Sequence, residues 1–137
     1  MTPELQTLAR RAVACKGWRW VPGMAVADAF GWRRGLVVDI APLPEPGAWV
    51  ANRAGVSWLS AEELGRCLPD LSDPGTLGCL LALVREAIGC PEAHVYYADL
   101  SRLWVVRWGH EGLGVRTVDA STEAEALVAA LEAAPCD

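Results

Sequence analysis

The chain is short of the residues that most often mark a nucleic-acid-binding protein or an enzyme. Its 137 residues include one lysine, two histidines and one phenylalanine, and 12 basic side chains stand against 17 acidic ones, for a formal charge of −5. Proteins that bind nucleic acid usually carry a basic excess, because counterions released from phosphate supply much of their affinity. The charge balance therefore predicts that duplex DNA is not a partner.

The sequence also lacks paired cysteines and long apolar runs, and both absences bear on the cellular compartment. The five cysteines are odd in number and form no CxxC pair, which predicts free thiols in a reducing cytosol. No charged start followed by an apolar run opens the sequence, and no apolar stretch approaches the ~20 residues that a membrane-spanning helix needs. We expect a cytoplasmic protein without a membrane segment.

The composition that remains is that of a packed globular chain. Hydrophobic residues make up 53% of the sequence and charged residues 21%, and a chain of this length can bury a core without disulfides or metals. We expect a single domain over residues 1–137.

Start and stop signals predict four helices. Each begins at a hydroxyl or carboxylate side chain that can accept hydrogen bonds from the first free N–H groups. The expected helices are bounded by Thr2 and Gly17, Ser60 and Leu68, Asp73 and Gly89, and Thr122 and Pro135. The helix over 74–88 carries apolar residues beyond one stripe, so we expect it to be covered on more than one side or to form a homodimer contact.

Alternating apolar residues predict strands between these helices. The expected strands cover residues 18–21, 35–40, 49–51, 56–59, 94–98, 102–108 and 115–120, and "NRAG" is turn chemistry for a short hairpin between the third and fourth. Strands grouped between helices predict an α+β fold with an antiparallel meander sheet. Helices on both faces of that sheet, as in an α/β/α sandwich, would explain why the strand over 102–108 is apolar on both sides.

Three segments together resemble a known family. They are "LARRAVACKGWRWVPGM", "LPDLSDPGTLGCLLALVREAIGCP" and "STEAEALVAALEAAP", in that order. In sequence and spacing they are similar to the phage ABA sandwich domain of small phage and prophage proteins. The resemblance implies a helix–sheet–helix sandwich and a phage setting, hence a bacterial host cytoplasm. It implies no activity and no functional residues.

Candidate catalytic and metal-ligating residues have simpler structural interpretations. Cys90 and His94 could supply two metal ligands, but nothing nearby completes a zinc set. The pair His110-Glu111 suits an exposed hairpin tip, and the capping box assigns Glu63 a structural task beside Glu62. We therefore expect no catalytic residue, no metal and no cofactor.

Tryptophan and arginine are the one excess, with seven tryptophans and 11 arginines. Such residues are common at binding hot spots and on base-stacking platforms. We expect Trp18, Trp20 and Trp104 to belong to the core, because regular strands would place them against helices. The expected interaction residues are Trp32, Arg33, Arg34, Trp108 and His110.

These observations predict a small non-enzymatic accessory protein of the phage type that binds a host or phage macromolecule, such as an anti-defence or host-takeover factor. The acidic balance favours a protein partner. The alternative is a nucleotide or single-stranded nucleic-acid binding module that uses the tryptophan and arginine residues.

Overall fold

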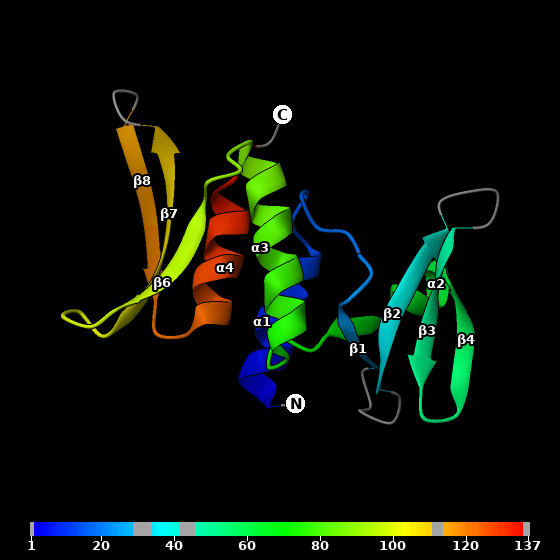
Figure 1. Ribbon diagram of the computed structural model, residues 1–137. Coiled ribbons are helices and arrows are strands. Elements are labelled where there is room, and N and C mark those ends of the chain that lie inside the picture. Colours follow the sequence, from blue (N-terminus) through cyan, green and yellow to red (C-terminus); the bar gives the residue numbers. More distant parts are fainter. Residues whose placement is uncertain (1, 29–33, 42–45, 111–113, 136–137) are drawn as a thin grey trace. The chain divides into compact units, whose positions relative to one another are not determined.

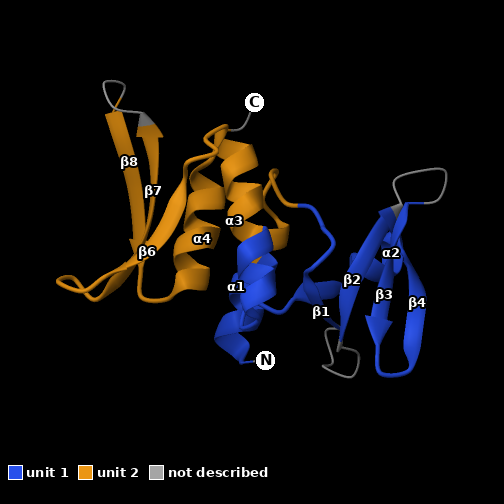
Figure 2. Cartoon of the chain, in the orientation of Figure 1, with its two compact units in different colours: residues 1–10, 19–79 blue, residues 11–18, 80–137 orange. Residues whose placement is uncertain are grey.

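The computed structural model describes residues 2–28, 34–41, 46–110 and 114–135 (Figure 1). The chain divides into two compact units (Figure 2): unit 1 contains residues 1–10 and 19–79, and unit 2 contains residues 11–18 and 80–137. Each unit is therefore built from two separate stretches of chain. The single domain over 1–137 stays a prediction.

Unit 1 contains a five-stranded antiparallel sheet. Its order is β4-β3-β2-β1-β5, and its strands are β1 (Ala25–Asp28), β2 (Arg34–Ala41), β3 (Gly47–Asn52), β4 (Gly55–Ser60) and β5 (Cys67–Pro69). The predicted strand over 35–40 and the predicted hairpin are confirmed. In the turn, the Asn52 side chain accepts a hydrogen bond from the Ala54 N–H at 2.8 Å.

A β-bulge interrupts the pairing of β2 with β3. The register shifts between Val37, opposite Val50, and Asp39, opposite Trp49. A bulge adds one residue to one strand and changes which side chains share a face. Beyond it, Ile40 joins the same face as Val37, although they are three residues apart.

Two helices in this part of the chain differ in length from the prediction. Helix α2 (Ala61–Leu64) begins with the expected capping box between Ser60 and Glu63, but β5 follows it at once, because residues 67–69 pair with β1. Helix α1 (Pro3–Val13) is capped by the Thr2 hydroxyl, which accepts from the Leu5 N–H. It ends four residues before the predicted Gly17, in a series of turns.

The strand predicted over residues 18–21 is wrong. Residues 18–21 belong to no strand, and the Met24 N–H donates to the Val21 carbonyl, which turns the chain. The alternation is nevertheless present, since Trp18 and Trp20 are half-buried and Arg19 is exposed. An extended segment can bury alternate side chains without belonging to a sheet.

Helix α3 (Pro74–Ile88) is the helix that the sequence determines best. Asp73 accepts from the Thr76 N–H at 2.8 Å, and Gly89 ends the helix with φ +73, as predicted. Residues 74–79 belong to unit 1 and residues 80–88 to unit 2. Its large apolar side chains are buried or half-buried, and the homodimer through helix 74–88 stays a prediction.

Unit 2 contains a three-stranded antiparallel sheet of order β6-β7-β8. The strands are β6 (His94–Ala98), β7 (Leu103–His110) and β8 (Gly114–Ala120), and α4 (Glu123–Ala133) packs on all three. Val106 in the middle strand and Leu127 and Val128 in α4 are fully buried. The Thr122 hydroxyl caps α4 as predicted, by accepting from the Glu125 N–H.

The predicted α+β class is confirmed: antiparallel strands with helices packed on them. The strands form two sheets, a division that the sequence pattern does not show. Within the described residues, no helix is both long and apolar enough to cross a membrane.

Candidate protein-binding site

The sheet of unit 1 exposes large apolar side chains on one of its faces. Leu36 on β2, Trp49 on β3 and Val56 on β4 are 45%, 43% and 60% exposed, and Val38 at the bulge is 43% exposed. The other face, which carries Val37, Ala48 and Val50, is buried, and α2 packs on β3 and β4. Half of the exposed large hydrophobic residues in the described chain thus lie on this one sheet.

Strand register brings these side chains together. Leu36, Ala51 and Val56 form one row across three strands, and Trp49 lies opposite Trp58. The two indoles meet edge to face, with ring centroids 5.3 Å apart and planes at 61°, an arrangement that favours aromatic pairs. We call Leu36, Trp49, Val56 and Trp58 the outer face.

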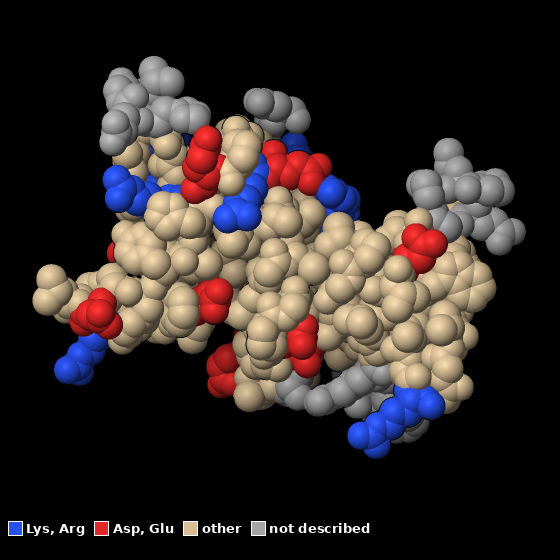
Figure 3. Space-filling model, viewed as in Figure 1, with Lys and Arg blue, Asp and Glu red and all other residues tan. Residues whose placement is uncertain are grey.

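Charge is scarce around the outer face. In the view of Figure 3, the surface over β2, β3 and β4 is mostly uncharged. Strand β4, "GVSWLS", carries no ionisable side chain. Asp39, opposite Trp49, is the acidic residue in this part of the sheet, and its carboxylate accepts from the Ile40 N–H at 2.9 Å.

The predicted interaction residues fall in different places. Trp32 and Arg33 lie outside the described residues. Arg34 begins β2, opposite Ala27 in unit 1, whereas Trp108 and His110 belong to β7 in unit 2, opposite Arg116 and Gly114. Trp108 is half-buried. The structure thus brings Trp108 and His110 onto one strand and assigns Arg34 to the other unit.

The outer face was not predicted from the sequence, although the register of the predicted hairpin already indicates part of it. A hairpin whose turn is Arg53-Ala54 necessarily sets Trp49 opposite Trp58. The predicted hairpin therefore already contained the tryptophan pair. The expected core residue Trp104 is half-buried and packs against Tyr97, with ring centroids 5.5 Å apart.

The residues considered as catalytic or metal-ligating candidates make contacts that belong to the fold. Cys90 is buried, and the His94 ring stacks on Tyr96 with centroids 5.5 Å apart. Glu63 completes the capping box, and Glu62 pairs with Arg66 at 2.9 Å. Glu111 lies outside the described residues. No group of three or more potential ligands that could hold a metal occurs in the described part of the chain.

Among the described residues, Cys79 and Arg11 have shifted pKa values. Burial, and to a smaller extent the negative charge of Asp73, raises the pKa of the Cys79 thiol, whose Sγ donates to the Pro22 carbonyl at 3.6 Å. A raised pKa keeps this thiol protonated at neutral pH and therefore a weak nucleophile. The pKa of Arg11 is raised, chiefly by its hydrogen bond to Glu132.

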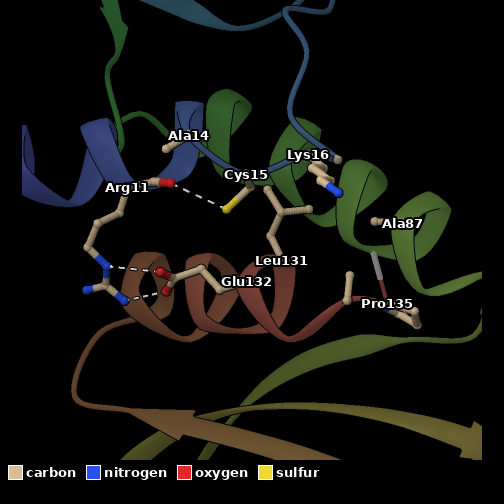
Figure 4. A pocket seen from close by; sticks show the side chains of 10 residues that line it. Arg11, Ala14, Cys15, Lys16, Ala87, Leu131, Glu132 and Pro135 are labelled. Carbon is tan, nitrogen blue, oxygen red and sulfur yellow. Dashed lines mark hydrogen bonds and ion pairs between the residues drawn. The ribbon is translucent and has the colours of Figure 1, made fainter. Parts of the chain in front are cut away.

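Unit 2 contains a pocket of about 520 Å³ between the end of α1 and the end of α4 (Figure 4). Arg11 and Glu132 form a bidentate ion pair at its side, and the Cys15 Sγ donates to the Arg11 carbonyl at 3.3 Å. The exposed Lys16 also lines the pocket, and so does the half-buried Ala87 from the last turn of α3. Three helices end here, and the negative ends of their dipoles favour cations such as Arg11 and Lys16.

No family model, no curated protein and no solved structure matches the chain. The resemblance to the phage ABA sandwich domain therefore stays a prediction from the sequence. The geometry of the outer face carries the functional argument.

Proposed function

We propose that this protein binds another protein through the outer face and acts without catalysis, as a small accessory protein of the phage type that its sequence resembles. The observation that carries the proposal is the cluster of Leu36, Trp49, Val56 and Trp58 on one face of the unit 1 sheet, where charge is scarce. A host protein is the partner that an anti-defence or host-takeover role requires.

Such a face favours a bound partner because binding removes its apolar side chains from water. Each Å² of apolar surface removed from water stabilises a complex by roughly 25 cal/mol. Soluble proteins seldom leave contiguous apolar patches open unless the patch has a use. Tryptophan contributes disproportionately at interfaces, because its large rigid ring loses little conformational entropy on binding. The Trp49–Trp58 pair provides such an anchor.

Capture from host lysate by the tagged full-length chain tests the proposal. We expect a discrete protein to be captured by the wild type, and its yield to fall about tenfold or more with Trp49→Thr, since hot-spot truncations cost at least ~2 kcal/mol. Threonine keeps the strand propensity of the site. Trp108→Thr is the matched control, because it also removes one half-exposed tryptophan but from unit 2.

Circular dichroism of both variants shows whether the fold is kept. Equal capture by folded Trp49→Thr and wild type would refute the proposal, and so would a lysate that yields no captured protein.

The alternative function, nucleotide or single-stranded nucleic-acid binding, is favoured by the cross-strand pair of Trp108 and Arg116 in unit 2. A base stacked on an indole with arginine meeting its phosphate is a common arrangement. The same experiment separates the two functions. Capture that survives nuclease treatment and Trp108→Thr excludes the alternative, whereas capture lost under both conditions supports it.

A further inference from the structure

Strand β4 is the long edge of the unit 1 sheet and pairs, among the described residues, with β3 alone. Because Asn52 and Gly55 flank a two-residue turn, they form a hydrogen-bonded pair, and every second residue of β4 then bonds to β3. Val56 and Trp58 lie between the residues of β4 that bond to β3. Their backbone N–H and C=O groups point away from β3, toward the open side of the sheet.

This edge lacks the usual protection against pairing. Natural edge strands carry charged side chains, proline or a bulge, whereas β4 contains none of them and keeps a regular register along its whole length. The opposite edge differs, since β5 has three residues and ends at Pro69. At its far end β4 is closed by the capping box, because Ser60 begins α2.

We propose that a second copy of this chain adds to β4 in antiparallel orientation, with Val56 of one copy opposite Trp58 of the other. A twofold axis then passes between the two Ser57 residues. Each Val56–Trp58 pair exchanges two backbone hydrogen bonds, so the open N–H and C=O groups of both copies are satisfied. The two sheets become one continuous sheet.

Side-chain chemistry favours a copy of the chain as the occupant. Valine opposite tryptophan is a stabilising β-branched–aromatic cross-strand pair, and Val56 is the most exposed residue of the outer face. Because β4 carries no charge, self-pairing sets no like charges opposite each other. A twofold dimer needs only one self-complementary surface, and this register makes β4 self-complementary.

The dimer uses the backbone edge of β4 and, of the outer face, the Val56 and Trp58 side chains. It leaves Leu36 and Trp49 open to a partner. It is independent of the proposed function: the dimer can form if no host protein is captured, and a host protein can be captured by a monomer. Their tests are accordingly separate.

Light scattering during size-exclusion chromatography of the full-length chain tests the assembly. We expect a mass of about twice 14.7 kDa for the wild type. Val56→Pro removes an N–H that β3 does not use, so the protomer stays folded and becomes monomeric. Val56→Thr keeps both the N–H and the β-branch and stays dimeric. A monomeric wild type at millimolar concentration, or a dimeric Val56→Pro, would overturn the proposal.

A cysteine scan tests the register. In a non-hydrogen-bonded antiparallel pair the Cα atoms lie ~4.5 Å apart, within the ~4.4–6.8 Å that a disulfide requires. Ser57→Cys should therefore form a covalent dimer on mild oxidation, whereas Val56→Cys, which lies opposite Trp58, should not. The wild type with its own five cysteines gives the background. Equal cross-linking of the two variants contradicts the register.

A separate substitution tests the alternative dimer through helix 74–88. Ala82 lies on the exposed side of α3, so Ala82→Glu would dissociate a helix-mediated dimer and leave a β4-mediated dimer intact. A dimer that is lost in Ala82→Glu and kept in Val56→Pro would replace our assignment.

Discussion

At the scale of single residues, Gly55 shows how one backbone position fixes the outer face. It closes the β3–β4 hairpin with φ +123, a region that side chains rarely occupy. We expect Gly55→Ala to lower the free energy of unfolding by about 1–3 kcal/mol, the range for a residue held in such a conformation. Urea denaturation followed by tryptophan fluorescence measures the change.

Gly78 is the matched control for this substitution. It lies in the interior of α3, is exposed, and has open space where a Cβ atom would stand. Gly78→Ala should raise the free energy of unfolding by about 0.5–1 kcal/mol, because alanine favours the helix. If both substitutions shifted stability in the same direction, the backbone explanation would fail.

At the scale of elements, Thr76 joins the start of α3 to strand β1. It is fully buried, its hydroxyl donates to the Asp73 carboxylate at 3.0 Å, and it accepts from the Ala25 N–H at 2.8 Å. Thr76→Val keeps the shape of the side chain but leaves that N–H without an acceptor. We expect the free energy of unfolding to fall by about 1–3 kcal/mol, the cost of a buried unsatisfied donor.

Thr76→Ser separates the hydrogen bond from packing, since it keeps the hydroxyl and removes a methyl group. We expect it to be less destabilising than Thr76→Val in the same chemical denaturation. The opposite order would show that the methyl group, and not the link to Ala25, stabilises this junction.

Elements with local signals could be predicted from the sequence, and elements that depend on distant partners could not. The caps at Ser60, Asp73 and Thr122 act within one helical turn, and all three form as expected. By contrast, residues 67–69 form β5 because β1 lies beside them, and residues 18–21 do not form the strand that their alternation predicts. Strand pairing is a tertiary property that a local pattern does not contain.

The candidate site was predictable only in part, for the same reason. The hairpin sets Trp49 opposite Trp58, and this much follows from its turn. Which face of the sheet is buried is decided by packing, so the exposure of Trp49 did not follow from the sequence. The bulge adds a further obstacle, because simple alternation along β2 would place Leu36 and Ile40 on the same face.

At the scale of the whole molecule, neither unit is a continuous segment. Unit 2 needs residues 11–18 as well as 80–137: Arg11 pairs with Glu132, and Gly17 packs tightly against Ala87 and Leu131. A cut between residues 79 and 80 would also divide α3. We therefore expect a fragment of residues 80–137 to lack a dispersed ¹⁵N–¹H spectrum.

Mixing this fragment with the complementary fragment 1–79 is the control. Dispersed signals that return on mixing would show that the missing stretch restores the fold, as expected. A well-dispersed spectrum from residues 80–137 alone would show that unit 2 is an independent domain, contrary to this prediction.

Lys16, beside the pocket at the end of α1, is the only lysine in the chain and is exposed. Amine-reactive dyes consequently have a single side-chain target, apart from the α-amino group. Because that target lies in unit 2, a fluorophore attached there modifies neither β4 nor the tryptophans of the outer face. The protein thus carries a natural position for site-selective labelling.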